Sequence, residues 1–458
     1  MNEKNEKNGK FMDKLESKLM PVAKVISSNK YLIAIRDGFL VSMPLLVIGS
    51  MFMLVSNFPV QPWIDFLKST TFHGSSIASY FSNVTNATFS IMAIFAVMGI
   101  GYNYAKQEKV SPIFGAASAL VSWFILMPFT TSFKPEGAAK AFQVPCVPLD
   151  WVGSRGIFIG ILCAIFSVKI YKWVEDKGWT IKMPKGVPPT VGQSFASLFP
   201  IGMVIVVFFL IRIIFTITPW DNAFDCIYTI LQTPLQKVGD TLGAMLGVYL
   251  FAHILWFFGI HGTNITDSVF RPILYALSAE NLAALQAGQK LPHIINTQFQ
   301  DLFATYGGAG STLSLLIAAY FFCKSKRIKE LSKMSIVPGI FNINEPVIFG
   351  LPIVLNPAIA IPFICVPMVN IIISYVTMAI GLVPICNGVI MPWTTPAIIS
   401  GFLSSGWQGA VLQAALIALG VLLYYPFIKA IDKQYLKEEA EAENNPKDDD
   451  ISLDDLTF

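Results

Sequence analysis

The stretch Gly339-Ile-Phe-Asn-Ile-Asn-Glu-Pro-Val-Ile-Phe-Gly-Leu-Pro352 places one carboxylate and two carboxamides inside an apolar run. An ionisable side chain is costly at membrane depth, so Glu345 is expected to have a functional role, with Asn342 and Asn344 beside it. Pro346 removes a backbone donor and favours extended geometry at Glu345, which predicts a broken backbone lining a cavity. The alternative is a polar loop or helix end at the membrane surface.

The composition around this stretch is that of a membrane protein. Hydrophobic residues make up 54% of the 458 residues, and charged residues only 13%. We therefore predict an all-α multi-spanning membrane protein of about ten transmembrane helices plus re-entrant or broken segments at 342–352 and 384–396. A net charge of +3 does not indicate a nucleic-acid partner, and six scattered cysteines without a C-x-x-C pair indicate free thiols.

Basic residues set the expected orientation in the bilayer. The first apolar run at 31–55 follows Lys14, Lys18, Lys24 and Lys30, and the dense basic segment 324–333 follows a later run. The positive-inside rule then places both basic segments in the cytoplasm, together with both termini. Residues 1–30 show no cleavable signal peptide, so the first span is expected to insert uncleaved. Residues 433–458 are charged and are expected to form a disordered cytoplasmic tail.

The chain between 261 and 311 is mixed in character. It is polar around 264–267, amphipathic through 276–287, and glycine-rich at Gly307-Gly-Ala-Gly310. This pattern predicts short or re-entrant segments rather than full spans. The glycine run fits either a substrate-facing hairpin tip or a close helix crossing.

Three motifs together resemble enzyme IIC, the sugar-transporting subunit of the bacterial phosphoenolpyruvate-dependent phosphotransferase system, in its lactose/cellobiose/diacetylchitobiose family. They are Asn-Ile-Asn-Glu-Pro at 342–346 with the Phe-Gly-x-Pro run after it, Phe-Gly-Ile-His-Gly at 258–262, and Met-Pro-Trp-Thr-Thr-Pro at 391–396. The resemblance covers most of the chain.

The resemblance implies an architecture and a set of partners. It implies a homodimer in the bacterial cytoplasmic membrane, with a dimerisation half at 31–218 and a sugar-binding half at 219–432. It also implies phosphorylated enzyme IIB as phosphoryl donor, with enzyme IIA upstream. Neither the tails nor the loops are long enough to house such a domain, so these partners are expected in trans.

Phosphoryl transfer to a sugar hydroxyl needs that hydroxyl held in line and deprotonated. Glu345 and His261 are the candidate catalytic pair, although His261 alone would fit a helix-end histidine held by backbone. Trp393 is the candidate ring that stacks on a pyranose, with an interfacial anchor as its alternative; Trp256 and Trp407 are interpreted as anchors. The other candidate substrate-binding residues are Asn342, Asn344, Gly262 and Thr394.

Three classes of function fit these residues. The favoured one is a permease that binds a β-linked disaccharide such as cellobiose, lactose or diacetylchitobiose and translocates it with phosphorylation at the 6-hydroxyl. The alternative is a proton-coupled sugar symporter with Glu345 and His261 as its proton relay. The third is an intramembrane metalloenzyme that adds His253 as a ligand, but paired-histidine spacing is missing, so neither a metal nor another cofactor is expected. His253 is instead interpreted as a packing or interhelical-bonding residue.

Overall fold

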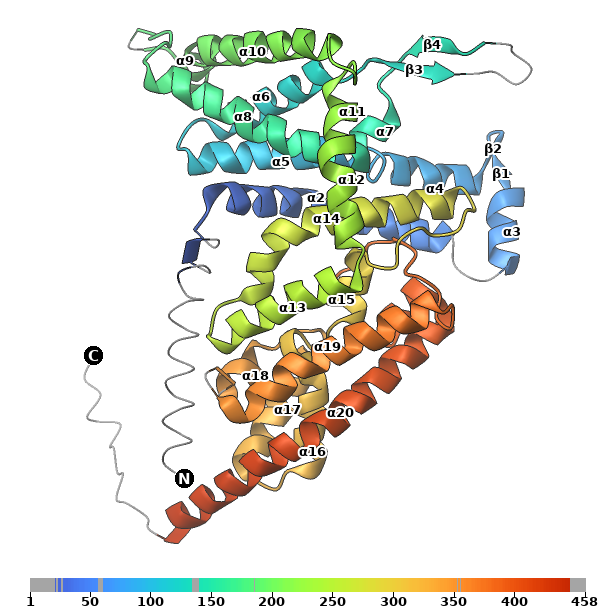
Figure 1. Cartoon of the computed structure of the whole chain (residues 1–458), viewed down its shortest axis with the longest axis vertical. Helices are drawn as coiled ribbons and strands as arrows, with labels where there is room; N and C mark the ends of the chain where they lie inside the picture. The colour runs from blue at the N-terminus through green and yellow to red at the C-terminus, as the bar shows by residue number, and fades with distance from the viewer. Residues whose placement is uncertain are drawn as a thin grey trace.

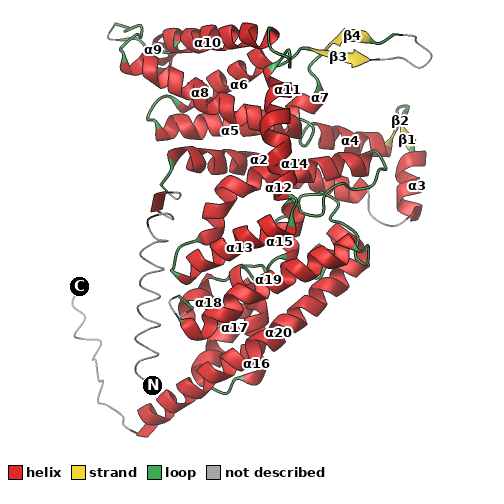
Figure 2. Ribbon diagram, viewed as in Figure 1, coloured by secondary structure: helices red, strands yellow, loops and turns green. Residues whose placement is uncertain are grey.

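The computed structural model describes residues 21, 24–25, 28–56, 61–133, 140–184, 186–351, 353–354 and 356–444. Its regular structure is almost entirely helical (Figure 2), which confirms a mostly helical chain. The described strands form two antiparallel hairpins, β1 (Thr71–Phe72) with β2 (Ser75–Ser76) and β3 (Thr130–Phe133) with β4 (Phe142–Pro145). Most of the segment 1–30 and all of 445–458 lie outside the described residues.

The N-terminal half is a layer of long apolar helices at the top of Figure 1. Its main helices are α2 (Lys30–Ser56), α5 (Met92–Gln107), α6 (Pro112–Leu126), α8 (Ile157–Asp176) and α10 (Leu198–Thr216). Shorter elements connect them: α3 (Gln61–Ser69), α4 (Ile77–Asn86), α7 (Leu149–Val152), η1 (Ser154–Gly156) and α9 (Pro189–Ala196). Helices α2 and α5 cross closely because Gly38 and Gly99 face each other there; a Cβ on either would collide with the opposing backbone.

The C-terminal half lies below this layer and is reached through a bent connection (Figure 1). The connection consists of helix α11 (Ala223–Ile227), the π-helical turn η2 (Tyr228–Gln232) and α12 (Thr233–Gly239). The chain then bends by 77° into α13 (Leu242–Phe257). The rest comprises α14 (Gly262–Gln286), α15 (Thr297–Phe303), η3 (Ala309–Ser311), α16 (Thr312–Phe322), α17 (Lys326–Ile340), α18 (Glu345–Gly350), α19 (Pro357–Ala379) and α20 (Ile399–Asn444).

A polar network anchors the bent connection to the neighbouring helix. The imidazole of His293 lies between two carboxylates, with Nδ1 2.9 Å from Asp240 and Nε2 2.7 Å from Glu280. Gln236 of α12 donates a 2.8 Å hydrogen bond to the other oxygen of Glu280. The network therefore joins α12, α14 and the loop before α15.

Several described helices could cross a membrane. Five are long and apolar enough by length and composition, and a sixth follows if the bent pair of Ala223–Gly239 and Leu242–Phe257 counts as one span. Two further apolar helices, Pro112–Leu126 and Ala309–Phe322, are shorter. The count of about ten spans stays a prediction.

Three expectations from the sequence are wrong. The region after 261 does not start with short segments, because α14 runs unbroken from Gly262 to Gln286 and its polar side chains pair inside the protein. Residues 433–444 are helical rather than disordered, since Glu439 accepts hydrogen bonds from the Ser325 hydroxyl (2.6 Å) and the Arg327 amide (3.1 Å). The backbone is indeed broken before α18, but Glu345 is helical, because Pro346 occupies the first turn, where a missing N–H costs nothing.

Candidate functional site

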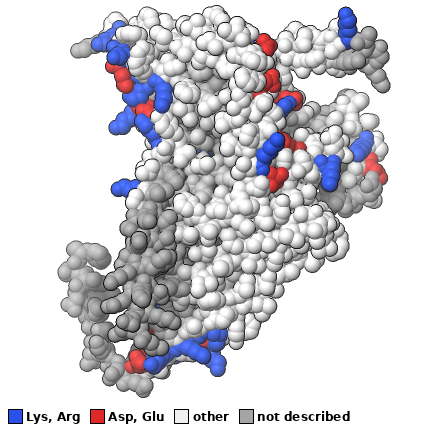
Figure 3. All heavy atoms as spheres, viewed as in Figure 1, with Lys and Arg blue, Asp and Glu red and all other residues white. Residues whose placement is uncertain are grey.

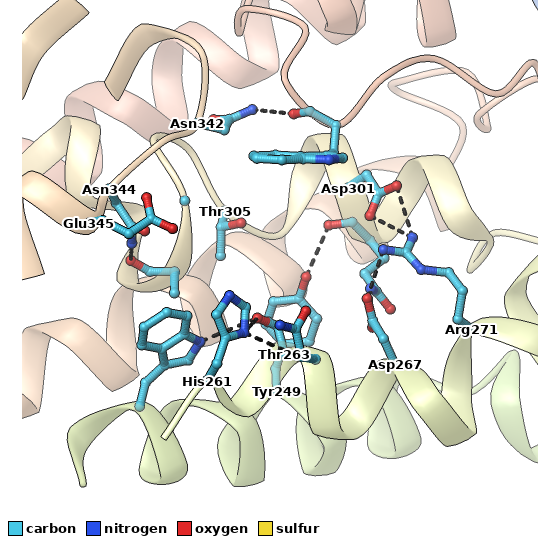
Figure 4. Close-up of a pocket in the computed structure, with 16 residues that line it drawn as sticks. Tyr249, His261, Thr263, Asp267, Arg271, Asp301, Thr305, Asn342, Asn344 and Glu345 are labelled. Atoms are coloured by element: carbon cyan, nitrogen blue, oxygen red, sulfur yellow. Dashed lines mark hydrogen bonds and ion pairs between the residues drawn. The ribbon is translucent and has the colours of Figure 1, made fainter. Parts of the chain in front are cut away.

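The three motifs meet around one open cavity of about 830 Å³. His261 comes from the start of α14, Asn342, Asn344 and Glu345 from the break before α18, and Trp393 from the non-helical segment before α20. Figure 4 shows that the labelled side chains of His261 and Glu345 lie at one end of the cavity, away from Arg271. The fold thus brings together five of the seven candidate residues.

The glycine run, residues 307–310, forms a turn between α15 and α16 at the wall of this cavity, and we call this turn the glycine tip. Gly307, Gly308 and Gly310 all have positive φ (76°, 85° and 77°), a conformation that L side chains rarely adopt. A Cβ on Gly308 would lie 2.6 Å from the Asn344 side chain. Gly308 and Ala309 line the cavity, so the run is both a cavity-facing tip and a point of close packing.

Asn342 and Asn344 bind this tip through their carboxamides. The Gly307 amide donates to Asn342 Oδ1 at 2.7 Å, and Asn344 Nδ2 donates to the Ala309 carbonyl at 2.9 Å. Asn342 Nδ2 also donates to the Trp393 carbonyl. Asn342 therefore ties the glycine tip, its own loop and the Trp393 segment into one unit, so both asparagines position the cavity wall through contacts that the sequence did not predict.

His261 caps α14 and faces the cavity at the same time. The Asn264 amide donates to its Nδ1 at 3.3 Å, so Nδ1 is unprotonated and the neutral ring carries its proton on Nε2. The Trp256 ring lies 4.3 Å from the imidazole, centroid to centroid. Trp256 is buried and lines the cavity, so its interpretation as an interfacial anchor is wrong.

Glu345 is exposed and lines the open cavity, so its carboxylate is not buried in an apolar environment. Its carboxylate is close enough to act electrostatically on the imidazole of His261. Glu345 and His261 therefore line the same cavity, and their action as a catalytic pair stays a prediction.

An ionic cluster forms the opposite end of the cavity. Arg271 binds both oxygens of Asp301 (2.7 and 2.9 Å) and one oxygen of Asp267 (2.8 Å). Gln300 donates to the other oxygen of Asp267 at 2.9 Å. The cluster has two carboxylates and one guanidinium, and each carboxylate oxygen has a further lone pair that can accept a hydrogen bond from a hydroxyl group. The spacing of Asp267 and Arg271, four residues apart on one helix, was the one signal in the sequence.

A second compartment of about 1080 Å³ continues from the first. The two share Asn264, the ionic cluster and Trp393, and the second extends to Arg36 and Phe39 of α2. Trp393 is 43% exposed at this junction. Both halves of the chain therefore line the full cavity.

The remaining candidates lie outside the cavity wall. Gly262 is buried, and a Cβ there would collide with the Ala252 carbonyl, so it permits close packing of α14 on α13. Thr394 lies in the turn beside Trp393 and does not line the cavity. Their roles in binding sugar stay predictions.

His253 has the structural role expected from the sequence. Its Nδ1 donates to the Tyr249 carbonyl of its own helix (2.8 Å), and its Nε2 accepts from the Gly310 amide (3.0 Å), so both nitrogens are hydrogen-bonded and Nε2 holds the glycine tip. Among the residues that the structure describes, no group of three or more His, Cys, Asp or Glu side chains is arranged to hold a metal ion.

Comparisons with known proteins agree in family and fold. A family model described as "Phosphotransferase system, EIIC" matches residues 36–367. The chain is 39% identical to the "Lichenan permease IIC component" of Bacillus subtilis, over 94% of this chain and 95% of that protein. It is 32% identical to a "PTS system lactose-specific EIICB component" of Staphylococcus haemolyticus, covering 92% of this chain and 70% of that longer protein. Among solved structures it resembles the transporter ChbC, the IIC component from an N,N'-diacetylchitobiose-specific phosphotransferase system, with 40% identity, a TM-score of 0.90, and coverage of 93% of this chain and 99% of ChbC.

Proposed function

Since the chain belongs to the EIIC family of the phosphotransferase system, we propose that it binds a β-linked disaccharide and translocates it with phosphorylation at the 6-hydroxyl. The phosphoryl donor would be the phosphocysteine of a partner enzyme IIB, which enzyme IIA recharges. A relative that is named EIICB and is longer than this chain supports a close working relation between the two components.

The observation that supports this proposal is that Glu345 and His261 line one cavity whose other walls suit a sugar. The 6-hydroxyl oxygen would attack phosphorus, the S–P bond to the partner's cysteine would break as the O–P bond forms, and the hydroxyl proton would pass to Glu345. The Nε2–H of His261 would hold the hydroxyl oxygen in line.

The other cavity walls fit a disaccharide in chemistry and size. Trp393 offers an exposed aromatic surface, which suits the apolar face of a pyranose ring, while the buried Trp256 supports the His261 ring from behind. Asp267 and Asp301 offer carboxylate oxygens to hydroxyl donors. The two joined compartments give room for a second ring beyond the one next to Glu345.

The proposal includes the arrangement in the membrane. The chain would cross the bacterial cytoplasmic membrane about ten times. The positive-inside rule would place both termini and the basic α17 in the cytoplasm. The half 31–218 would form a homodimer, and the half 219–432 would hold the sugar. The broad exposed apolar face of α10, which includes Phe209 and Ile214, is available for lipid or for a second copy.

Uptake of radiolabelled sugars into proteoliposomes tests this function. Cellobiose, lactose and diacetylchitobiose are supplied outside, with or without the phosphoenolpyruvate relay and enzyme IIB inside. We expect accumulation of the 6-phosphate only with the complete relay. Uptake without the relay that collapses with the proton gradient would overturn the proposal and favour the symporter.

A further inference from the structure

A structured basic platform extends beyond the sugar cavity at the lower end of the molecule. It consists of the start of α17, which carries Lys326, Arg327, Lys329 and Lys333, held against residues 429–439 of α20, whose last turns are acidic. Figure 3 shows Lys and Arg atoms at this end, with Asp and Glu atoms beside them, below a broad uncharged surface. Asp432 of α20 accepts hydrogen bonds from the Lys324 and Ser325 amides at 2.8 and 2.9 Å. The Arg327 guanidinium lies 4.6 Å from the Tyr435 ring. The platform is therefore held in place by specific contacts rather than being a loose basic loop.

Helix α17 turns one face inward and one outward. Ile328, Ser332, Ser335 and Gly339 are buried, at the spacing of a single helix face. The opposite side carries exposed basic residues first and exposed apolar residues later, with Met334 71% and Val337 61% exposed. We call this exposed side the α17 face, and it comprises Lys326, Lys329, Glu330, Lys333, Met334 and Val337. Glu330 pairs with Lys333 at 2.7 Å, and the three lysines leave the face with a net positive charge.

The α17 face leads directly to the catalytic end of the cavity. Helix α17 has 15 residues, which span about 22 Å at the helical rise. It ends at Ile340, two residues before Asn342 and five before Glu345. The other described basic cluster on the proposed cytoplasmic side, at the end of α8, contains Lys177 and Lys182 but leads to no cavity residue.

We propose that the α17 face is the docking surface for enzyme IIB, with the basic start of α17 receiving acidic groups at the edge of the donor protein. The apolar end, which lies next to the Glu345 segment, would pack close to the phosphocysteine. This inference rests on the proposed function. A phosphoryl group brings roughly two negative charges at neutral pH, so a donor protein in its charged form is attracted to a cationic surface. Exposed apolar residues bordered by charged ones are the composition of a protein interface.

The double variant Lys329→Glu/Lys333→Glu in nanodiscs of zwitterionic lipid tests the docking surface. The KM for phosphorylated enzyme IIB should rise about tenfold at low salt, and the difference should shrink as ionic strength rises. The kcat at saturating enzyme IIB and the Kd for sugar without enzyme IIB should stay near those of the wild type. Direct binding of unphosphorylated enzyme IIB should weaken in parallel with the KM effect, which separates docking from chemistry.

The matched control is Lys177→Glu/Lys182→Glu, which makes the same charge change on the same proposed side of the membrane. An unchanged KM in the α17 variant, or an equal rise in the control, would overturn the docking surface. An effect of the α17 variant that appears only in nanodiscs with anionic lipid would assign the face to lipid headgroups instead. Phosphorylation of sugar by the wild-type protein in the same assay tests the proposed function independently. If the wild type does not phosphorylate sugar, the proposed function is wrong, whatever the α17 variants show.

Discussion

Replacing Asn342 tests whether a single side chain pre-orders the sugar cavity. Its carboxamide accepts from the Gly307 amide at 2.7 Å and donates to the Trp393 carbonyl. At a net value of about 1 kcal/mol for each hydrogen bond, Asn342→Gly should cost about 2 kcal/mol of stability. Asn342 also has a φ of 64°, and an alanine held in this region costs roughly 1–2 kcal/mol more, so Asn342→Ala should cost about 3–4 kcal/mol.

The assay is thermal unfolding of the purified protein combined with equilibrium sugar binding. We call the two hydrogen bonds of the Asn342 carboxamide the Asn342 clamp. Because this clamp orders the Trp393 segment before sugar binds, Asn342→Gly should also weaken sugar binding about tenfold, or 1.4 kcal/mol. Adding Trp393→Ala should then cost less than the sum of the two single changes, since both remove the same ordered surface. Wild-type affinity in Asn342→Gly, or full additivity of the two changes, would refute the clamp.

Three further predictions concern recognition, pH and orientation. Trp393→Phe should retain much of the sugar affinity and Trp393→Ala should lose about 1–3 kcal/mol; equal near-normal affinities would make Trp393 an anchor only. Burial lowers the pKa of His293, but hydrogen bonds to Asp240 and Glu280 outweigh this and raise the pKa to about 9. The folded pKa of His293 exceeds the unfolded value of about 6.5, so the network stabilises the fold fully below about pH 6.5 and loses this effect as the pH approaches 9. The difference in Tm between the wild type and His293→Gln should therefore narrow between these two pH values. A Tm difference that stays constant with pH would contradict this role of His293. A single cysteine at Lys329 in a background without other cysteines should react with an impermeant maleimide only after the cell membrane is opened, and labelling of intact cells would reverse the proposed topology.

Local sequence patterns predicted the parts of the fold that depend on local physics. The apolar run at 31–55 corresponds to α2 (Lys30–Ser56), and the punctuated stretch around Glu345 does break the backbone. These patterns depend on hydropathy and on the backbone restrictions of proline and glycine. Both can be recognised within one short segment of the sequence.

The features that were missed depend on partners distant in sequence. Asp301 meets Arg271 across 30 positions, and Glu439 meets Ser325 across 114, so neither the Asp301 side of the ionic cluster nor the helical end of α20 has a local signature. The same holds for Asn342, whose carboxamide was expected to bind sugar but makes hydrogen bonds to backbone at Gly307 and Trp393. Contacts between residues distant in the sequence determine these features, and the hydrophobic periodicity of a single segment does not reveal such contacts.

Glu345→Gln offers the most direct measurement of the catalytic proposal. The change keeps the size of the side chain and one hydrogen bond but removes the base. With saturating phosphorylated enzyme IIB, we predict that the kcat for sugar phosphorylation falls by about 100-fold or more, the range of a lost general base, while the Kd for the disaccharide changes by less than about threefold. A parallel fall in affinity and rate would make Glu345 a sugar ligand only, and unimpaired phosphorylation would contradict a catalytic role for Glu345 altogether.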